Sequence, residues 1–352
     1  MAQARSRIPR GPAVAGLDLT ADRVRAVVVH SEDAVMRVTG VAQAPLRPGW
    51  MSGGLVVDRD AVGSAVGSAL SVAEGRERAT KVVAVIDGDD VRTYHNAITF
   101  EREALDAPMA HGEVARAVQE ARADAERTAR EAASNDAALR GIATVQLRDD
   151  VAGLAIDGRP LASLIGFQGR FVEVRTDVAL APLVLASAAS GALDAAKRKG
   201  TVASGAYALG RLLASCGLAE GAVLRMGADV TAFAVVRGSR VVATRAFGLG
   251  RDAFLARDGR SAQDAATWAR CVVAPLPGFD GLLPARWYFV GVPEELLELP
   301  RALGAVVAEQ RGGEVEIAPL RPAAATRVLS QEPLHADDLV AVGAAGLAGG
   351  LL

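Results

Sequence analysis

The chain has 352 residues, enough for about two average domains, and 51% of them are hydrophobic, which excludes disorder over most of its length. A net charge of −2 argues against electrostatic binding of DNA or RNA. Cys216 and Cys271 are the only cysteines, too few for a disulfide scaffold and without the spacing of a zinc site. Since neither a membrane-spanning stretch nor a secretory signal is recognisable, we expect a soluble cytoplasmic protein.

Runs rich in β-branched residues predict strands along the whole chain, and segments of helical period lie between them. We expect strands at Ala13–Leu19, Val24–His30, Lys81–Ile86, Ile142–Leu147, Phe171–Val178, Ala222–Met226, Val230–Val236, Arg240–Ala246 and Arg286–Gly291. We expect helices at Ala61–Glu74, His111–Ala133, Gly205–Cys216, Ser261–Val272 and Glu294–Gln310. This mixture predicts an α/β or α+β protein.

The predicted helix at His111–Ala133 combines a stripe of small apolar residues with charges of alternating sign. The stripe consists of Val114, Ala117, Val118, Ala121 and Ala125. The other faces carry charges that can pair at i,i+4, among them Arg122, Glu126, Arg127 and Arg130. A helix of this kind packs on its stripe, and such charges are usually solvated. The functional alternative is that these four charged residues dock a partner.

Two segments about 200 residues apart share a pattern of strand, tight turn and strand. Gly16–Asp22 leads into the strand at Val24–His30, and Val223–Asp229 leads into the strand at Val230–Val236. Both turns end in Ala-Asp. We interpret this internal repeat as two duplicated halves that face each other across a cleft. Chance similarity between two apolar hairpins is the alternative.

Five segments between residues 13 and 350 resemble the motifs of one family. The hairpin GLDLTADRVRAVVV is similar to a phosphate motif of the form GLDIGTSK, and Gly53–Asp58 resembles KGVVVD. Val82–Ile98 resembles the start of an inserted subdomain, and Ala341–Leu347 resembles a closing helix, AVGLALYG. Asp157–Val174 follows the most specific motif, DG..I.DPIGM.G.RLEV. The chain thus resembles the actin-like ATPase superfamily and, within it, the FtsA-like cell-division proteins.

This resemblance implies an α/β fold of two duplicated actin-like (ribonuclease H-like) halves around a cleft, with an inserted FtsA-type α+β lobe, also called an SHS2 domain. The first half would comprise residues 12–80, 171–200 and 334–352. The lobe would comprise residues 81–170. The second half would comprise residues 201–333, with a shortened peripheral segment at 251–285.

The resemblance implies that ATP and Mg²⁺ would bind between two glycine-containing turns. In this chain the phosphate motifs of both turns are degenerate. In the first turn Asp18 survives, while Thr20, Ala21 and Asp22 replace Gly-Thr-Ser and Arg23 replaces a lysine. The second motif, roughly DIGGGTTD, corresponds to Arg225–Ala232 and has lost both aspartates. The third, TGGG, keeps one glycine. The remnants of a cofactor site are Asp18, Thr20, Arg23, Arg225, Gly227, Thr231 and Gly291.

Electrostatics also argues against a nucleotide. Asp22 and Asp229 are expected at the two turn tips, where phosphates would lie, and two like charges about 4 Å apart repel by about 4 kcal/mol at an effective dielectric constant of 20. We therefore expect no cofactor, and a salt bridge from Arg225 to an aspartate across the cleft. The alternatives are a divalent ion between the aspartates, or ATP with Mg²⁺ held by Arg23 and Arg225.

The leading hypothesis is a non-catalytic, FtsA-like scaffold, a pseudo-ATPase that acts in cell division or envelope assembly through protein contacts. The resemblance implies division or envelope-assembly partners, indirect contact with FtsZ-like filaments, and self-association. We expect no nucleic acid, no direct transmembrane anchor, and membrane association only through partners. One alternative is an active ATPase with rearranged phosphate contacts. The other is a PilM-like component of type IV pilus assembly, against which the Asp157–Val174 signature favours the FtsA-like assignment.

The remaining candidate residues are expected to be structural. Trp268 lies on the apolar stripe of its helix and is assigned to the core. Asp149–Asp150 and Asp337–Asp338 flank predicted elements and are assigned to caps and turns. The four histidines are scattered without metal-ligand spacing, so we expect no metal site.

Overall fold

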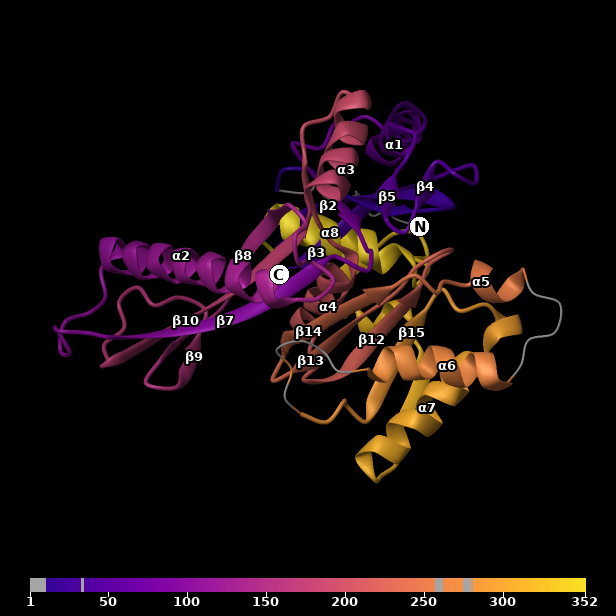
Figure 1. Ribbon diagram of the computed structural model, residues 1–352. Coiled ribbons are helices and arrows are strands. Elements are labelled where there is room, and N and C mark those ends of the chain that lie inside the picture. The colour runs from indigo at the N-terminus through magenta and orange to yellow at the C-terminus, as the bar shows by residue number, and fades with distance from the viewer. Residues whose placement is uncertain (1–10, 33–34, 257–261, 275–278, 280) are drawn as a thin grey trace, which may run out of the picture.

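The computed structural model describes residues 11–32, 35–256, 262–274, 279 and 281–352. Within them, a six-stranded sheet is formed by the first hairpin, its continuation and three strands from distant parts of the chain (Figure 1). In spatial order its strands are β11 (Thr201–Ser204), β6 (Lys81–Ile86), β1 (Val14–Thr20), β2 (Arg23–Glu32), β3 (Val35–Pro45) and β17 (Val328–Ser330). A two-stranded ribbon, β4 (Met51–Ser52) and β5 (Leu55–Val56), forms a sheet of its own and packs against the core of the larger one.

A five-stranded sheet contains the second hairpin. Its spatial order is β14 (Arg240–Phe247), β13 (Thr231–Arg237), β12 (Glu220–Met226), β15 (Arg286–Val290) and β16 (Glu316–Pro319). β12, β13 and β14 are antiparallel neighbours, and β15 and β16 are added in parallel beside β12. The larger sheet has the same arrangement, because β1, β2 and β3 are antiparallel while β6 and β11 are added in parallel beside β1.

Helices pack on both faces of each of these two sheets. Between the sheets, α4 (Gly205–Ser215) and α8 (Asp338–Gly349) share one apolar core with β1, β2 and β13. The outer face of the six-stranded sheet packs on α1 (Arg59–Glu74) and α3 (Leu183–Ala195). The outer face of the five-stranded sheet packs on α6 (Ala262–Val273) and α7 (Glu298–Arg311), with the short α5 (Asp252–Leu255) nearby. The layers alternate helix, sheet, helix, sheet, helix.

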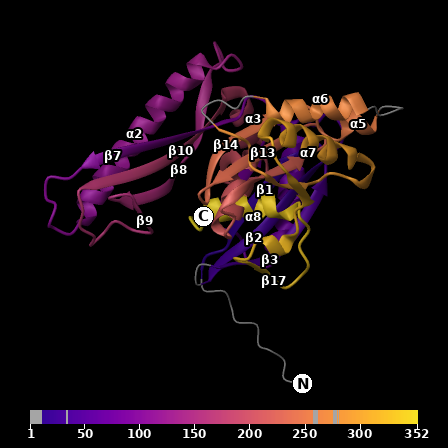
Figure 2. The same ribbon diagram turned by 90° about the horizontal axis from the view of Figure 1, so that it is seen from below.

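A separate lobe projects from this body (Figure 2). Its four-stranded sheet has the spatial order β7 (Arg92–Glu101), β10 (Phe171–Pro182), β8 (Thr144–Ile156) and β9 (Arg159–Leu161). One face is covered by α2 (His111–Asn135), which confirms the helix predicted there. The residues of α2 that are buried form an alanine stripe at every fourth position: Ala117, Ala121, Ala125, Ala129 and Ala133.

The pairing of strands places the limits of the lobe differently from the expected residues 81–170. β6 belongs to the six-stranded sheet, where five consecutive buried residues suit a strand flanked by parallel neighbours rather than a half-exposed lobe. β10 belongs to the lobe sheet, between β7 and β8, and not to the first half. β11 and β17, expected in the second half, also pair in the six-stranded sheet.

Several further elements differ from the sequence-based expectation. The helix expected at Glu294–Gln310 is divided into a 3₁₀ turn at Glu294–Leu296 and α7, and a second 3₁₀ turn spans Pro322–Ala324. Ser261, the expected start of α6, lies outside the described residues. Among the described helices, none is long and apolar enough to cross a membrane.

Candidate functional site: the cleft between two hairpin turns

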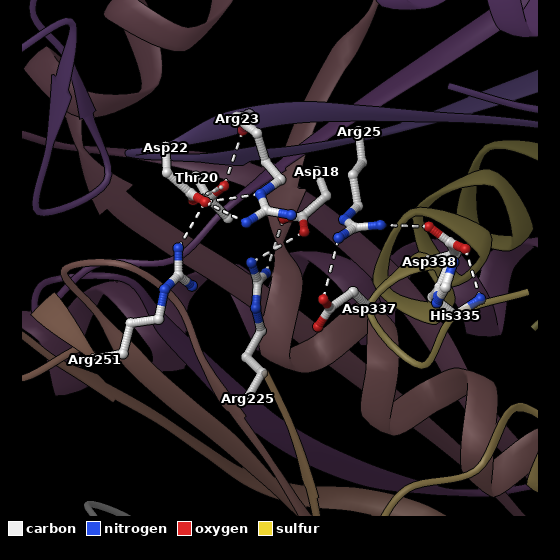
Figure 3. A network of polar contacts seen from close by, with 10 residues as sticks. All are labelled: Asp18, Thr20, Asp22, Arg23, Arg25, Arg225, Arg251, His335, Asp337 and Asp338. Atoms are coloured by element: carbon white, nitrogen blue, oxygen red, sulfur yellow. Dashed lines mark hydrogen bonds and ion pairs between the residues drawn. The ribbon is translucent and has the colours of Figure 1, made fainter. Parts of the chain in front are cut away.

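The turn between β1 and β2 is held by its own polar side chains and by the opposite half of the body (Figure 3). The hydroxyl of Thr20 lies 2.8 Å from the carbonyl oxygen of Arg23 and donates to it. The carboxylate of Asp22 accepts from Nε of Arg23 at 2.7 Å and pairs with Arg251, before α5, at 2.6 Å. Burial alone would raise the pKa of Asp22, but the charges of Arg251 and Arg23 outweigh it and hold that pKa below its ordinary value.

The turn between β12 and β13 makes the reciprocal contact. The N–H of Gly227 donates to the carbonyl oxygen of Val230 at 2.8 Å, which closes the turn. The carboxylate of Asp229 accepts the N–H of Gly53, in the loop between β4 and β5. Each turn therefore has its aspartate bound to a segment on the other side of the cleft, Asp22 to Arg251 and Asp229 to the loop at Gly53.

Arg225 fills the bottom of the cleft. Its side chain reaches from β12 toward β1, where its guanidinium lies 2.9 Å from Oδ1 and 3.0 Å from Oδ2 of Asp18. The same guanidinium lies 3.1 Å from the carboxylate of Asp87, directly after β6. All three side chains are less than a tenth exposed. The salt bridge predicted between Arg225 and an aspartate is thus confirmed, and it has a second carboxylate that was not predicted.

Asp87 also fixes the start of α4. Its Oδ1 accepts the N–H of Ala206 at 2.9 Å, at the end of the helix where free N–H groups and the helix dipole favour a negative charge. Burial raises the pKa of Asp87 and of Asp18, although the charge of Arg225 opposes this for both. For Arg225, burial acts to lower the pKa, but the two carboxylates overcome it and raise that pKa.

The space left between the turns is small. It has a volume of about 20 Å³ and is lined from both sides, by Leu19, Thr20, Ala21, Gly54, Asp87, Arg225, Gly227, Asp229 and Val230. A space of this size holds about one water molecule. In this arrangement the residues do not fit a nucleoside triphosphate with Mg²⁺, because Arg225 is already paired and Asp22 and Asp229 stand at the turn tips.

The structure brings together five of the seven remnant residues named from the sequence. Asp18, Thr20, Arg23, Arg225 and Gly227 belong to the two turns or to the strands leading into them.

Thr231 and Gly291 instead have local structural roles. The hydroxyl of Thr231, fully buried, lies 2.7 Å from the carbonyl oxygen of Leu249 and accepts the indole N–H of Trp268 at 3.2 Å. Trp268 is therefore a core residue, as expected. Gly291 has a φ of +74°, and a Cβ there would lie 2.5 Å from the carbonyl oxygen of Met226.

A second polar cluster beside the cleft was not predicted. Arg25, on β2, pairs with Asp338 at 2.6 Å and with Asp337 at 3.1 Å, at the start of α8. Asp338 is also a hydrogen-bond acceptor for the N–H of His335 at 2.8 Å. The acidic pair was assigned to caps and turns: Asp338 does hold the turn before α8 through the N–H of His335, whereas the side chain of Asp337 makes no capping hydrogen bond to α8. The cluster instead ties α8 to the first hairpin.

The charged residues of α2 lie on its exposed side and pair with neighbouring carboxylates. Arg127 contacts Asp124 and Glu131, and Arg130 lies 2.8 Å from Glu126. The fourth candidate residue, Arg122, lies 3.6 Å from Asp149 of β8. Arg127 and Arg130 are at least half exposed, so the helix presents mixed charges to the solvent.

The Asp157–Val174 signature has a local structural explanation. Asp157, at a φ of +47°, accepts the N–H of Phe171 at 2.8 Å and of Arg170 at 3.1 Å, which joins the β8–β9 turn to the start of β10. At Gly169, a Cβ would lie 2.1 Å from a methyl carbon of Ile156. These residues build the end of the lobe.

Comparison with known proteins gives a fold but no family. No protein-family model matches the sequence, and no curated protein matches it. Among solved structures, a PilM–PilN type IV pilus biogenesis complex matches with a TM-score of 0.54 and 20% identity, over 96% of this chain and 97% of that one. The chain has an actin-like ATPase fold.

Two further solved structures match at lower similarity. The ethanolamine utilization protein EutJ from Carboxydothermus hydrogenoformans is 14% identical, with a TM-score of 0.48 over 96% of this chain and 90% of that one. A Bacteroides thetaiotaomicron protein described as having the actin-like ATPase fold is 7% identical, with a TM-score of 0.38 over 89% of this chain and 92% of that one.

Proposed function

We propose that the chain is a non-catalytic actin-fold scaffold in a cell-envelope assembly machine and that it acts by binding other proteins. The observation that carries this proposal is the ion-paired Arg225, which lies between Asp18 and Asp87 where the two turns converge. The resemblance described above assigns this position to the phosphates and metal of a bound nucleotide.

Energetics supports a cleft that works without nucleotide. Pulling Arg225 away from its partners would leave two buried carboxylates without a counterion, which costs about 3–5 kcal/mol. Phosphates entering between the turns would also approach Asp22 and Asp229, whose charges repel them. An ATPase with rearranged phosphate contacts would need Arg23 and Arg225, and both are already bound to aspartates. We therefore infer that the cleft serves to hold the two halves together.

The structural comparison supports an envelope-assembly role of the PilM kind. The matching PilM structure is a complex with PilN in type IV pilus biogenesis, and the likeness extends over nearly the whole of both chains. We propose by analogy that this chain binds a protein component of such a machine, and that any association with the membrane occurs through that partner.

An FtsA-like role in cell division is the second candidate, favoured by the Asp157–Val174 signature. Its hydrogen bonds and close contacts build the end of the lobe, so the signature supports the lobe's architecture more than a particular division partner. Under this candidate, contact with FtsZ-like filaments would be indirect. In either role the exposed charges of α2, Arg122, Glu126, Arg127 and Arg130, are a candidate surface for partner binding or self-association.

Affinity purification under native conditions, followed by mass spectrometry, tests the scaffold role. We expect pilus-type or other envelope-assembly proteins to co-purify with the chain and to remain bound after ATP is depleted. Recovery of FtsZ and division proteins would favour the second candidate. Co-purification that requires ATP would contradict a scaffold independent of nucleotide.

A further inference from the structure

An open groove of about 570 Å³ lies between the lobe and the turn that joins β13 to β14. In the lobe, Ile156, Val172 and Val174 pack toward α2. Because side chains alternate along strands, the neighbouring Ala155 and Arg175 lie on the other face of the sheet. The groove opens on the side of Arg175, toward the turn after β13, while Leu154 and Leu161 of its lining also pack against the apolar cluster under α2. Its lining is mostly small or apolar: Ala152, Gly153, Leu154, Ala155, Gly158, Pro160, Leu161, Ala162 and Gly238, together with Arg175 and Arg240.

Two arginines approach each other over Gly153. A Cβ at Gly153 would lie 3.7 Å from Cδ of Arg175 and 4.0 Å from Cδ of Arg240, so both stems pass over this glycine. Arg175 contacts the carboxylate of Glu173. Within the part of the chain that the structure describes, the guanidinium of Arg240 has no hydrogen bond or ion pair at contact distance. Burial and the nearby charge of Arg175 lower the pKa of Arg240. Glu173 and Asp177 also act on Arg240, but neither lines the groove, whose two charged lining residues are both arginines.

The groove also runs beside a free strand edge. β9 pairs only with Leu154–Ile156, while β8 continues in the other direction as far as Thr144. Ala152 is skipped in the pairing of β8 with β10, which marks a bulge next to the end of β9. Among the described strands, none pairs with Ala152 and Gly153 on the β9 side. An edge of this kind can accept an added strand.

We propose that this groove binds an extended acidic segment of a partner protein, which continues β9 along the free edge of β8 and places a carboxylate against Arg240. Main-chain hydrogen bonds supply affinity in this binding mode, and the side-chain contacts supply specificity. The small floor residues let the backbone of the segment approach, and the free edge begins at Gly153 and Ala152, directly beyond the last residue of β8 that pairs with β9. This inference rests on the proposed scaffold role and assigns it a docking site distinct from α2.

A random 12-residue peptide display library, selected on the purified full-length chain, provides the test. We expect the selected sequences to be enriched in aspartate and glutamate. The strongest peptide, synthesised with a fluorescent label, should bind at least tenfold more weakly to Arg240→Glu and to Gly153→Val. It should bind the Arg301→Glu variant as it binds the wild type, because Arg301 is an exposed arginine on α7 that does not line the groove. Melting curves of all variants check that they remain folded.

Strand addition is tested separately by blocking backbone N–H groups of the bound peptide. N-methylation of alternate residues removes every second N–H, so one of the two alternately methylated peptides should lose binding while the other keeps it. The proposal is overturned if acidic residues are not enriched, if Arg240→Glu binds like Arg301→Glu, or if both methylated peptides bind like the parent. Such a failure would leave the scaffold role intact, because that role is contradicted by dependence on ATP and not by the location of the docking site.

Discussion

The guanidinium of Arg225 lies 2.9 Å from Oδ1 of Asp18, although 207 positions separate the two residues in the chain. Each residue comes from the first strand of its own hairpin, β1 or β12, so the ion pair joins the two sheets at corresponding places. Asp87 adds a contact from the end of β6. The cleft of this actin-like fold is thus spanned by protein charges, and the predictions below follow from that arrangement.

Replacing Arg225 alone should be strongly destabilising. In Arg225→Met, Asp18 and Asp87 would be buried without a counterion, and we expect a loss of about 3–5 kcal/mol in the free energy of unfolding at neutral pH. Burial raises the pKa of both carboxyls above their unfolded value of 3.8. The loss should therefore be small below about pH 3, where both carboxyls are protonated in the folded and unfolded states. It should grow as pH rises above the unfolded value of 3.8 and should level off above the raised folded-state pKa. Urea unfolding at several pH values measures it.

The matched control removes the charges together. Arg225→Met combined with Asp18→Asn and Asp87→Asn leaves no buried ion, and Asn at position 87 keeps an oxygen for the N–H of Ala206. We expect this triple variant to be markedly more stable than Arg225→Met at neutral pH, without the added pH dependence. Equal destabilisation of both variants would show that packing, not the unpaired charge, is what Arg225 contributes.

The contact between Asp22 and Arg251 should make stability depend on pH in the opposite sense. The pKa of Asp22 is lowered in the folded protein, so its contribution is present above the unfolded value of 3.8 and is lost as pH falls through the folded-state value. At pH 7 we expect Asp22→Asn to be less stable than wild type by about 1 kcal/mol. The difference in melting temperature should shrink as pH falls below 3.8 and vanish below the lowered folded-state pKa of Asp22. A difference that does not shrink as pH is lowered from 7 into the acid range would exclude the ion pair as its cause.

Charge reversal on α2 tests the candidate interaction surface. We expect Arg122→Glu combined with Arg127→Glu and Arg130→Glu to abolish partner binding or self-association in sedimentation and pull-down experiments. The melting temperature should stay within a few degrees of wild type, because exposed ion pairs add little to stability. The control reverses three other exposed arginines, Arg76, Arg301 and Arg321. Wild-type association of the α2 variant would count against this surface.

Close packing of α8 should make Gly16 intolerant of a side chain. A Cβ at Gly16 on β1 would lie 1.9 Å from the carbonyl oxygen of Ala341 and 2.5 Å from the nitrogen of Ala345. We expect Gly16→Ala to lose several kcal/mol or to fail to fold, since overpacking a core typically costs about 1–3 kcal/mol even without backbone clashes. Gly112→Ala is the matched control, because a Cβ there meets nothing within 4 Å and alanine favours the helix. Equal melting temperatures for the two variants would contradict this packing.

The hairpins and the helices beside them were predictable because the spacing of apolar residues within each segment indicates which of its faces is buried. The charge-free stretch at Val178–Leu193 did not reveal its two elements, since an apolar run buried on most sides fits strand or helix equally. In the structure, Pro182 ends β10 and α3 follows directly.

Only those residues of the site that lie within a recognisable motif could be predicted from the sequence. Asp18 and Arg225 occupy equivalent hairpin strands, and their opposite charges made the ion pair foreseeable. Asp87 carried one usable signal, a carboxylate directly after a fully apolar strand. Nothing in the sequence around Arg251 indicates that it would reach Asp22, because that contact depends on how the two sheets are packed against each other.

Thermal unfolding with and without millimolar Mg-ATP tests the central claim most directly. A ligand at 100 times its dissociation constant stabilises a protein by about 2.7 kcal/mol, which would raise the melting temperature of a chain of this size by several degrees. The arrangement of Arg225, Asp18 and Asp87 predicts no change in melting temperature and no release of phosphate. A saturable rise in melting temperature with ATP concentration would contradict a cleft that works without nucleotide.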